Sequence, residues 1–379
     1  MMKLYARVKH LIKTETVLLI SAFVAIVTMF FVKPSLHYIS YLDLRVLSLL
    51  FCLMAVVAGL NDTGIFIRVS EKLLKKVQNI RSLSFVFISL SFFSSMLITN
   101  DVALITFVPF AIMILRMTGQ EKYFIPVIVL DTIAANLGSM LTPIGNPQNL
   151  YLYNTYYVSM IDFLQITLPY TILSFLLLSI TIILMKKETL QLTIINKSEE
   201  KKTDNKKRYM LTMYCILFLV CLTCVIRILD YRLTLLIVFV VILIFDRKIL
   251  RKVDYSLLLT FVCFFIFVGN IGNIPVIRNY LGNLLVSREL TVALIASQII
   301  SNVPTAVLLS AFTDNYKALI LGTDIGGLGT LVASLASLIS YKFYCKTEHA
   351  KPGKYLGVFS LYNLVFLVVL CLFYMLTNT

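Results

Sequence analysis

The chain consists of long apolar stretches separated by short charged segments. Stretches without a charged residue cover 17–32, 46–61, 82–100, 102–115, 132–161, 163–185, 209–226, 233–245, 255–277, 290–313, 325–341 and 355–379. A helix that crosses the hydrocarbon core of a bilayer needs about 20 predominantly apolar residues. The pattern therefore predicts an all-α polytopic membrane protein.

Charged residues at the ends of these stretches indicate which side of the membrane each loop faces. Placing the N-terminus in the cytoplasm, with Lys3, Arg7, Lys9 and Lys13, leaves most of the 34 Lys and Arg residues on the cytoplasmic side. Such an excess is the positive-inside pattern of membrane proteins. Topology thus explains the formal net charge of +15, and we expect no nucleic-acid partner. The predicted location is the cytoplasmic membrane, with lipid around a multi-pass chain.

The composition supports a transporter rather than an enzyme. Hydrophobic residues make up 59% of the chain and charged residues 14%, whereas soluble domains carry about 25% charged residues. His10, His37 and His349 all fall in predicted loops. We therefore expect neither a histidine-based catalytic site nor a metal cluster.

Two stretches are predicted to be hairpins that enter and leave the membrane on the same side. The first, ~82–115, is interrupted at Thr99-Asn100-Asp101, and the second, ~290–313, at Ser301-Asn302-Val303. A long element follows each hairpin, at ~123–150 and at ~318–345, with Gly, Pro or polar residues in its middle. Pro removes a helical N–H group and Gly permits irregular dihedral angles. Both long elements are therefore predicted to be broken transmembrane helices.

This order of elements occurs twice. We predict an N-terminal repeat at 1–185, a cytoplasmic linker at 186–209 and a C-terminal repeat at 210–379. In the predicted topology the first copy begins inside and the second begins outside, because helix ~210–227 reverses the direction. Inverted repeats of this kind recur in secondary transporters.

The hairpin tips and helix breaks are the predicted substrate site. Non-helical backbone at membrane depth is tolerated only where protein or a water-filled cavity satisfies it. Free N–H groups at a helix N-terminus can hold an anion without Lys or Arg, and carbonyl oxygens of a broken helix suit Na⁺. The candidate substrate-binding residues are Thr99, Asn100, Asn136, Thr142, Pro143, Gly145, Asn146, Ser301, Asn302, Thr305, Gly326 and Thr330.

Three carboxylates are predicted at membrane depth, where an ionisable side chain is costly and usually functional. Asp101, Asp131 and Asp324 are the candidate carriers of a coupling H⁺ or Na⁺, with a structural role as the alternative for Asp131. Asp101 and Asp324 are predicted to lie at corresponding breaks of the two repeats, the second break running from Gly322 to Thr330. No cofactor is expected beyond this ion. The candidate Na⁺ ligands are Asn100, Asp101, Gly145 and Asn302.

Simpler interpretations apply to some neighbouring residues. Pro147 can mark only a kink, and Thr142 can hydrogen-bond to its own helix. Tyr151, Tyr153, Tyr156 and Tyr157 follow the first break and are interpreted as a belt at the membrane interface.

At these residues the sequence resembles the ion transporter superfamily, in particular its arsenite-permease and citrate-transporter-like branch, which is related to the divalent anion symporters. The similar segments are A-G-L-N-D-T-G at 58–64, I-T-N-D-V-A-L at 98–104, T-P-I-G-N-P-Q-N at 142–149 and I-S-N-V-P-T-A at 300–306. The dicarboxylate symporters carry Ser-Asn-Thr at both tips, whereas Asp101 follows the first tip here.

The resemblance implies a scaffold domain and a transport domain with two opposed re-entrant hairpins, two broken helices and elevator-type alternating access. It implies secondary transport of a small inorganic or carboxylate anion (citrate-like), coupled to H⁺ or Na⁺. Na⁺/H⁺ antiport and arsenite efflux are the alternatives. A homodimer is one assembly consistent with this interpretation.

Overall fold

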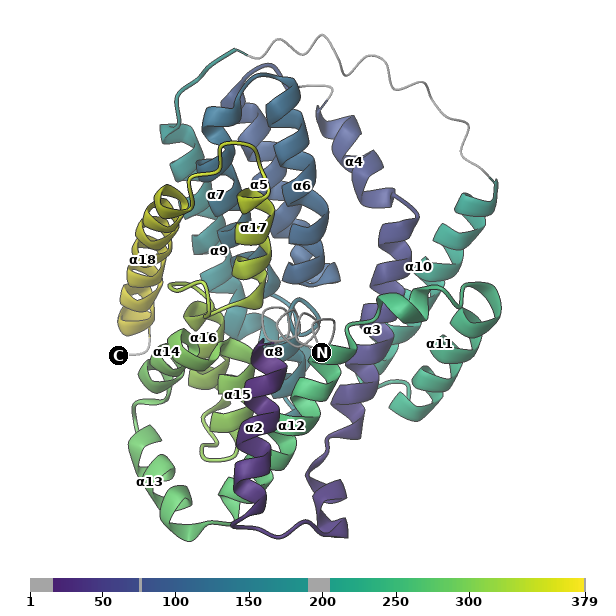
Figure 1. Cartoon of the computed structure of the whole chain (residues 1–379), viewed down its shortest axis with the longest axis vertical. Coiled ribbons are helices and arrows are strands. Elements are labelled where there is room, and N and C mark those ends of the chain that lie inside the picture. Colours follow the sequence, from purple (N-terminus) through teal and green to yellow (C-terminus); the bar gives the residue numbers. More distant parts are fainter. Residues whose placement is uncertain (1–15, 75–76, 190–204, 378–379) are drawn as a thin grey trace, which may run out of the picture.

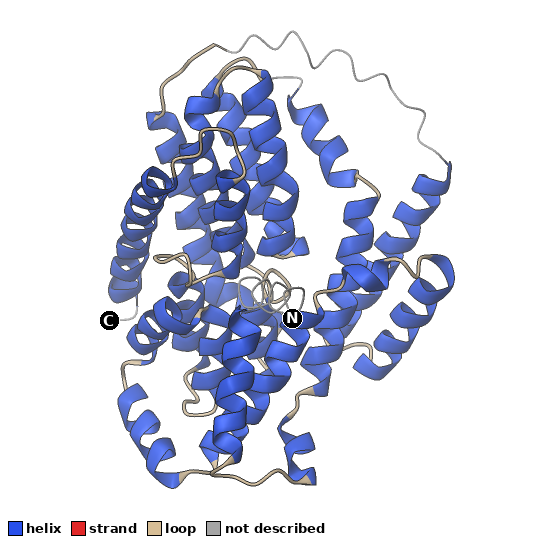
Figure 2. Cartoon of the chain, in the orientation of Figure 1, coloured by secondary structure: helices blue, strands red, loops and turns tan. Residues whose placement is uncertain are grey.

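The computed structural model describes residues 16–74, 77–189 and 205–377. In these ranges the regular structure is helical, and the only β-type pairing is a single bridge between Asn79 and Thr189 (Figure 2). Ile80 adds a backbone hydrogen bond to Glu188 across the same contact. The predicted all-α fold is confirmed for the part of the chain that is described.

The helices of the first half run from α2 to α9. Their bounds are α2 Thr16–Met29, η1 Leu36–Tyr41, α3 Leu44–Asp62, α4 Ile65–Leu74, α5 Ile80–Ile98, α6 Asn100–Met117, η2 Glu121–Tyr123, α7 Phe124–Ser139, α8 Pro147–Thr155 and α9 Met160–Leu184. Asp43 caps the start of α3 and Asn79 the start of α5, each through a side-chain oxygen that accepts a backbone N–H.

The second half runs from α10 to α18. Its bounds are α10 Asn205–Val225, α11 Tyr231–Phe245, η4 Ile249–Lys252, α12 Tyr255–Gly272, α13 Pro275–Leu285, α14 Glu289–Ile300, α15 Asn302–Ser310, α16 Tyr316–Gly326, α17 Leu335–Cys345 and α18 Pro352–Thr377. Residues 190–204 of the predicted cytoplasmic linker lie outside the described residues.

Seven of the described helices are long and apolar enough to cross a membrane: α3, α5, α6, α9, α10, α12 and α18. Many of their apolar side chains face outward. On α18, for example, Leu361, Leu364 and Leu372 are more than half exposed. An outward apolar surface of this kind suits lipid rather than water. The chain is a polytopic membrane protein.

The interruptions that the sequence indicates are real breaks between helices. Thr99 alone separates α5 from α6, and Ser301 alone separates α14 from α15. The long elements break at 140–146 and at 327–334. The predicted position of the second break needs correction, because Asp324 lies in the last turn of α16 and not in the break. The helix continues to Gly326 and ends where the glycines follow one another most closely.

The two hairpins occupy opposite halves of the molecule. Helices α5 and α6 lie with α7 in the upper half of Figure 1, and α14, α15 and α16 lie below them. The arms differ in length: α5 and α6 have 19 and 18 residues, and α14 and α15 have 12 and 9. The first hairpin is therefore long enough by itself for each arm to span a bilayer, and its re-entrant path remains a prediction.

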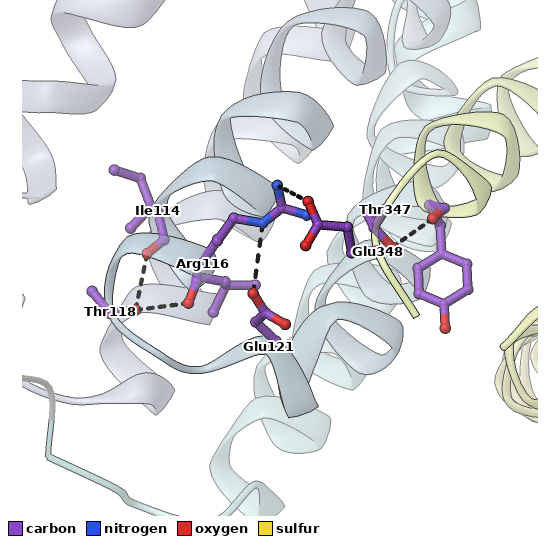
Figure 3. Close-up of polar contacts among 8 residues, drawn as sticks. Ile114, Arg116, Thr118, Glu121, Thr347 and Glu348 are labelled. Carbon is purple, nitrogen blue, oxygen red and sulfur yellow. Dashed lines mark hydrogen bonds and ion pairs between the residues drawn. The ribbon is translucent and has the colours of Figure 1, made fainter. Parts of the chain in front are cut away.

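Turns from the two halves meet at the upper end of the molecule. Arg116, at the end of α6, lies 3.6 Å from Glu121 and 3.9 Å from Glu348 of the α17–α18 loop (Figure 3). All three side chains are more than 40% exposed. Exposed ion pairs contribute about 0–1 kcal/mol, so buried contacts deeper in the molecule hold the halves together.

Candidate functional site

Each hairpin tip is bonded to the helix break of its own half. The backbone N–H of Asn100 donates to the carbonyl of Gly145 (3.1 Å), and that of Asn302 donates to the carbonyl of Ala333 (3.0 Å). The residue before each Asn has a positive φ, 71° at Thr99 and 73° at Ser301. Such a conformation costs a residue other than Gly about 1–3 kcal/mol and persists only where its surroundings enforce it.

The tip amides are less available to a ligand than the sequence suggested. We expected free N–H groups there, but the N–H groups of Asn100 and Asn302 are taken by the two breaks. The N–H of Asp101 is taken by the Asn100 side chain at 3.0 Å. The polar side chains around the tips therefore matter more than the helix N-termini.

Polar side chains around the first tip are hydrogen-bonded to Asn136. Its Oδ1 accepts from Asn100 Nδ2 at 3.0 Å and from Ser334 Oγ at 3.1 Å. Its Nδ2 donates to Ser337 Oγ at 3.3 Å. All four side chains are buried. Because Ser334 and Ser337 belong to the second half, this cluster joins the two halves.

Asp324 collects the corresponding groups near the second tip. Its Oδ1 accepts from Asn146 Nδ2 at 3.1 Å and from Gln148 Nε2 at 3.5 Å, and its Oδ2 accepts from Asn149 Nδ2 at 3.0 Å. Asp324 is 3% exposed. Its three partners belong to the first half. This cluster therefore also joins the two halves, with its central residue in the second half.

The two clusters occupy matching positions in the sequence. Asn146 and Asn149 follow Asn136 by ten and thirteen residues, and Ser334 and Ser337 follow Asp324 by the same ten and thirteen. Asn136 therefore corresponds to Asp324 and contacts the counterparts of the residues that Asp324 contacts. From the sequence we had expected Asp324 to correspond to Asp101. The residue that corresponds to Asp101, directly after the second tip, is Val303.

Glycines allow each hairpin to approach its broken helix closely. A Cβ atom on Gly138 would lie 2.1 Å from the carbonyl oxygen of Phe92 and 2.7 Å from Ser95 Oγ. A Cβ atom on Gly326 would lie 2.8 Å from Ser297 Oγ. Each glycine stands two residues after Asn136 or Asp324, and each serine stands four before its tip. Gly326 is thus a packing residue in this structure, and its carbonyl oxygen accepts from Gln298 Nε2 at 2.8 Å.

Several predicted site residues bond elsewhere. Thr142 Oγ1 donates to the Met96 carbonyl, which ties the first break to α5. Thr305 Oγ1 donates to Ser301 in its own helix, and exposed Thr330 pairs with Gln298. Pro143 is buried beside these groups but can donate no hydrogen bond.

Asp131 lies apart from both clusters. It is fully buried in the packing of α7 against α5, where Oδ1 accepts from Ser91 Oγ at 3.2 Å. Its Oδ2 has no hydrogen-bond partner in the structure. A carboxyl group with one neutral partner in an apolar core is strongly disfavoured as an anion.

Asp101 faces a separate cavity of about 150 Å³ between the first hairpin and helices α3 and α12. Thr99, Asn146, Lys252 and Asp254 also line it. Lys252 Nζ is paired with Asp62 at 2.5 Å. The cavity therefore joins the polar centre to charged residues at the ends of η4 and α3.

The structure decides one further interpretation. Tyr151 and Tyr153 are 7% and 2% exposed and pack in the core, so they form no interfacial belt. Within the described residues, no group of three or more His, Cys, Asp or Glu side chains could hold a metal ion.

Four residues of the clusters were not singled out from the sequence. Gln148 and Asn149 lay in a segment that we had noted, whereas Ser334 and Ser337 carried no signal of their own. Aligning the two halves on their helix breaks would have found both serines, since they match Asn146 and Asn149 in spacing.

Comparison with known proteins shows which family the sequence resembles. The chain is 33% identical over 325 residues to the uncharacterized transporter MJ0456 of Methanocaldococcus jannaschii, covering 85% of this chain and 86% of that protein. It is 30% identical over 302 residues to the inner membrane protein YbiR of Escherichia coli, covering 76% and 77%. A shorter match of 33% over 129 residues joins it to the silicon efflux transporter LSI3 of Oryza sativa, covering 34% and 26%. The family model described as citrate transporter matches residues 9–318, and the chain therefore belongs to the citrate transporter family of membrane transporters.

Proposed function

We propose that this protein is a secondary active transporter that moves a small inorganic or carboxylate anion, of the citrate type, across the cytoplasmic membrane. A gradient of H⁺ or Na⁺ drives the transport. The observation that carries the proposal is the pair of buried polar clusters around Asn136 and Asp324, in a chain of the citrate transporter family.

The clusters supply hydrogen-bond donors in place of cationic side chains. Asn100, Asn136, Ser334 and Ser337 present amide and hydroxyl groups between the two halves, and none carries a charge. Burial strengthens hydrogen bonds to an anion because the local dielectric is low. An anion bound here must displace some of the hydrogen bonds within the clusters, which join the two halves, so binding is linked to the contact between the halves.

Alternating access follows from this link in the proposed mechanism. The hairpins and broken helices, with α9 and α18, form the moving transport domain. Helices α2, α3, α10, α11 and α12 form the scaffold domain. The cavity beside Asp101 lies at this boundary and is the proposed route by which the substrate leaves or reaches the site. Elevator movement of the transport domain would transfer the clusters from one side of the membrane to the other.

Transport by the purified protein in liposomes tests the proposal. Uptake of labelled citrate, sulfate and phosphate is measured with an imposed H⁺ gradient, an imposed Na⁺ gradient and neither. Asn100→Ala and Asn302→Ala should abolish uptake while expression is retained. Asn154→Ala is the matched control, because Asn154 is a buried α8 residue whose Nδ2 bonds only to Leu150 of its own helix. Normal uptake by both tip variants would show that the site is elsewhere.

A second candidate is efflux of arsenite, a small hydroxylated acid that is neutral near pH 7. It is favoured by the clusters themselves, whose amide and hydroxyl groups can both donate to and accept from a neutral ligand. The partial match to a silicon efflux transporter points the same way. Arsenite loss from inside-loaded liposomes decides this alternative. A Na⁺-dependent pH change without any added anion would instead indicate Na⁺/H⁺ antiport.

A further inference from the structure

Asp324 is the one ionisable side chain of its cluster, and no charged side chain among the described residues is hydrogen-bonded to it. The three side chains that bond to Asp324 are the carboxamides of Asn146, Gln148 and Asn149. None of them is charged. An ionised carboxylate buried with neutral partners usually gains a cation, because Coulomb attraction is strong where the dielectric is low.

An unused oxygen lies beside this carboxylate. Asn149 is fully buried, and its Nδ2 donates to Asp324 Oδ2 at 3.0 Å. Its Oδ1, on the same amide group, has no hydrogen-bond partner among the residues that the structure describes. A buried carbonyl oxygen without a partner costs about 1–3 kcal/mol. Such an oxygen next to a carboxylate is a ligand of the type that Na⁺ prefers.

The neighbouring amides differ in their freedom to turn. Asn146 Oδ1 accepts the backbone N–H of Asn149 at 2.9 Å and so caps α8, which fixes its orientation. Gln148 Nε2 makes the longest of the three contacts to Asp324, at 3.5 Å. A half-turn of the Gln148 amide would bring Oε1 toward the carboxylate in place of Nε2.

The matching cluster in the first half is neutral. Asn136 stands in the place of Asp324, and Ser334 and Ser337 stand in the places of Asn146 and Asn149. In both clusters, side chains of the opposite half bond to the central residue. The ionisable group is therefore a property of one cluster and is not required by the architecture.

We propose that Asp324, Asn149 and Gln148 form a Na⁺ site, with the carboxylate, Asn149 Oδ1 and Gln148 Oε1 as side-chain ligands. This inference rests on the proposed function and names its coupling ion. It differs from the Na⁺ ligands expected from the sequence, which lay at the tips. Because Asp324 is on α16 and its partners are on α8, the ion binds both halves together. Bound Na⁺ should therefore stabilise the folded protein.

The test measures ion binding without transport. The thermal midpoint of the purified full chain is recorded in detergent as NaCl replaces choline chloride at constant ionic strength. The wild-type midpoint should rise and saturate with Na⁺. Asp324→Asn and Asn149→Ala should each weaken the apparent Na⁺ affinity by at least about tenfold, the low end of what altering a metal site costs.

Asn154→Ala is again the control. Asn154 Oδ1 also lacks a hydrogen-bond partner among the described residues, but Asn154 Nδ2 donates to the Leu150 carbonyl and not to a carboxylate. This variant should keep the wild-type response. An equal Na⁺ response in wild type, Asp324→Asn and Asn149→Ala would overturn the site. No Na⁺ response in wild type would overturn it as well, while anion uptake driven by an H⁺ gradient would leave the proposed function standing. Should Asp324→Asn fail to fold, the Na⁺ dependence of the thermal midpoint of Asn149→Ala decides whether the site exists.

Discussion

Replacing Gly138 with Ala tests how closely the first hairpin packs on its broken helix. The new Cβ would lie 2.1 Å from the backbone oxygen of Phe92, and contacts under 3.0 Å require something to move. Since the obstacle is backbone, helices α5 and α7 must separate. Overpacking a well-packed core costs about 1–3 kcal/mol and occasionally more. We therefore expect the free energy of unfolding to fall by about 3 kcal/mol.

The corresponding change in the second half should be milder. In Gly326→Ala the nearest atoms belong to the Ser297 side chain, at 2.8 and 2.9 Å. We expect the free energy of unfolding to fall by about 1–2 kcal/mol, which is within the range for overpacking. Ser297→Gly should restore most of it, because the next neighbour, Leu294 Cα, lies at 3.2 Å. No single side-chain substitution should rescue Gly138→Ala.

Thermal midpoints by fluorescence-detected size-exclusion chromatography provide the measurement. Gly357→Ala is the control, because nothing lies within 4 Å of the added Cβ and it stands in the exposed part of α18. That change should be neutral or stabilising by up to about 1 kcal/mol through helix propensity. If Gly138→Ala matched Gly357→Ala in midpoint, the close approach of α5 and α7 would be refuted.

Three further outcomes are expected. In a cysteine-free background, an impermeant thiol reagent applied to intact cells should label a cysteine placed at Tyr157, which is 74% exposed, but not one placed at Ser198, which lies outside the described residues; the reverse pattern would invert the predicted topology. Asp101→Asn should keep substrate exchange in liposomes but lose accumulation against a gradient, and unchanged accumulation would make Asp101 structural. The pKa of Glu188 is lowered by hydrogen bonds from Lys122 and Tyr123. Its depressed pKa stabilises the fold above the ordinary value of 4.5. The midpoint difference between wild type and Glu188→Gln should therefore stay constant from about pH 5 to 8 and shrink below that range, and a change near neutrality would contradict the assignment.

The sequence predicts the helix breaks well because their causes are local. At Thr99, Ser301 and 140–146, polar residues or Gly and Pro within an apolar stretch mark the places where a helix ends. The signal is not sufficient by itself, because Pro109 and Pro169 lie inside α6 and α9. The end of α16 was placed too early because a polar residue, Asp324, was taken to be part of the break. A buried carboxylate in a helix gives the same sequence signal as a carboxylate in a loop.

The remaining site residues could not be predicted because their partners are distant in sequence. Ser334 and Ser337 are ordinary small residues until Asn136, from the other half, is placed against them. Tyr151 and Tyr153 were misinterpreted for a similar reason. Aromatic residues after a break suit a membrane interface, but α8 is enclosed by other helices, and Tyr151 bonds to Ser310 at 2.8 Å.

The crossed clusters explain why neither half could form the site alone. The central residue of each cluster, Asn136 or Asp324, lies on one half, and side chains at or just after the break of the other half bond to it. Asn146 has both a structural contact and a contact in the candidate site. Its Oδ1 caps α8, and its Nδ2 donates to Asp324. Any ligand that draws Asp324 away from its amides also alters the start of α8. In the proposed mechanism, binding at the centre is therefore coupled to helix geometry on both sides, which is the property that an alternating-access transporter needs.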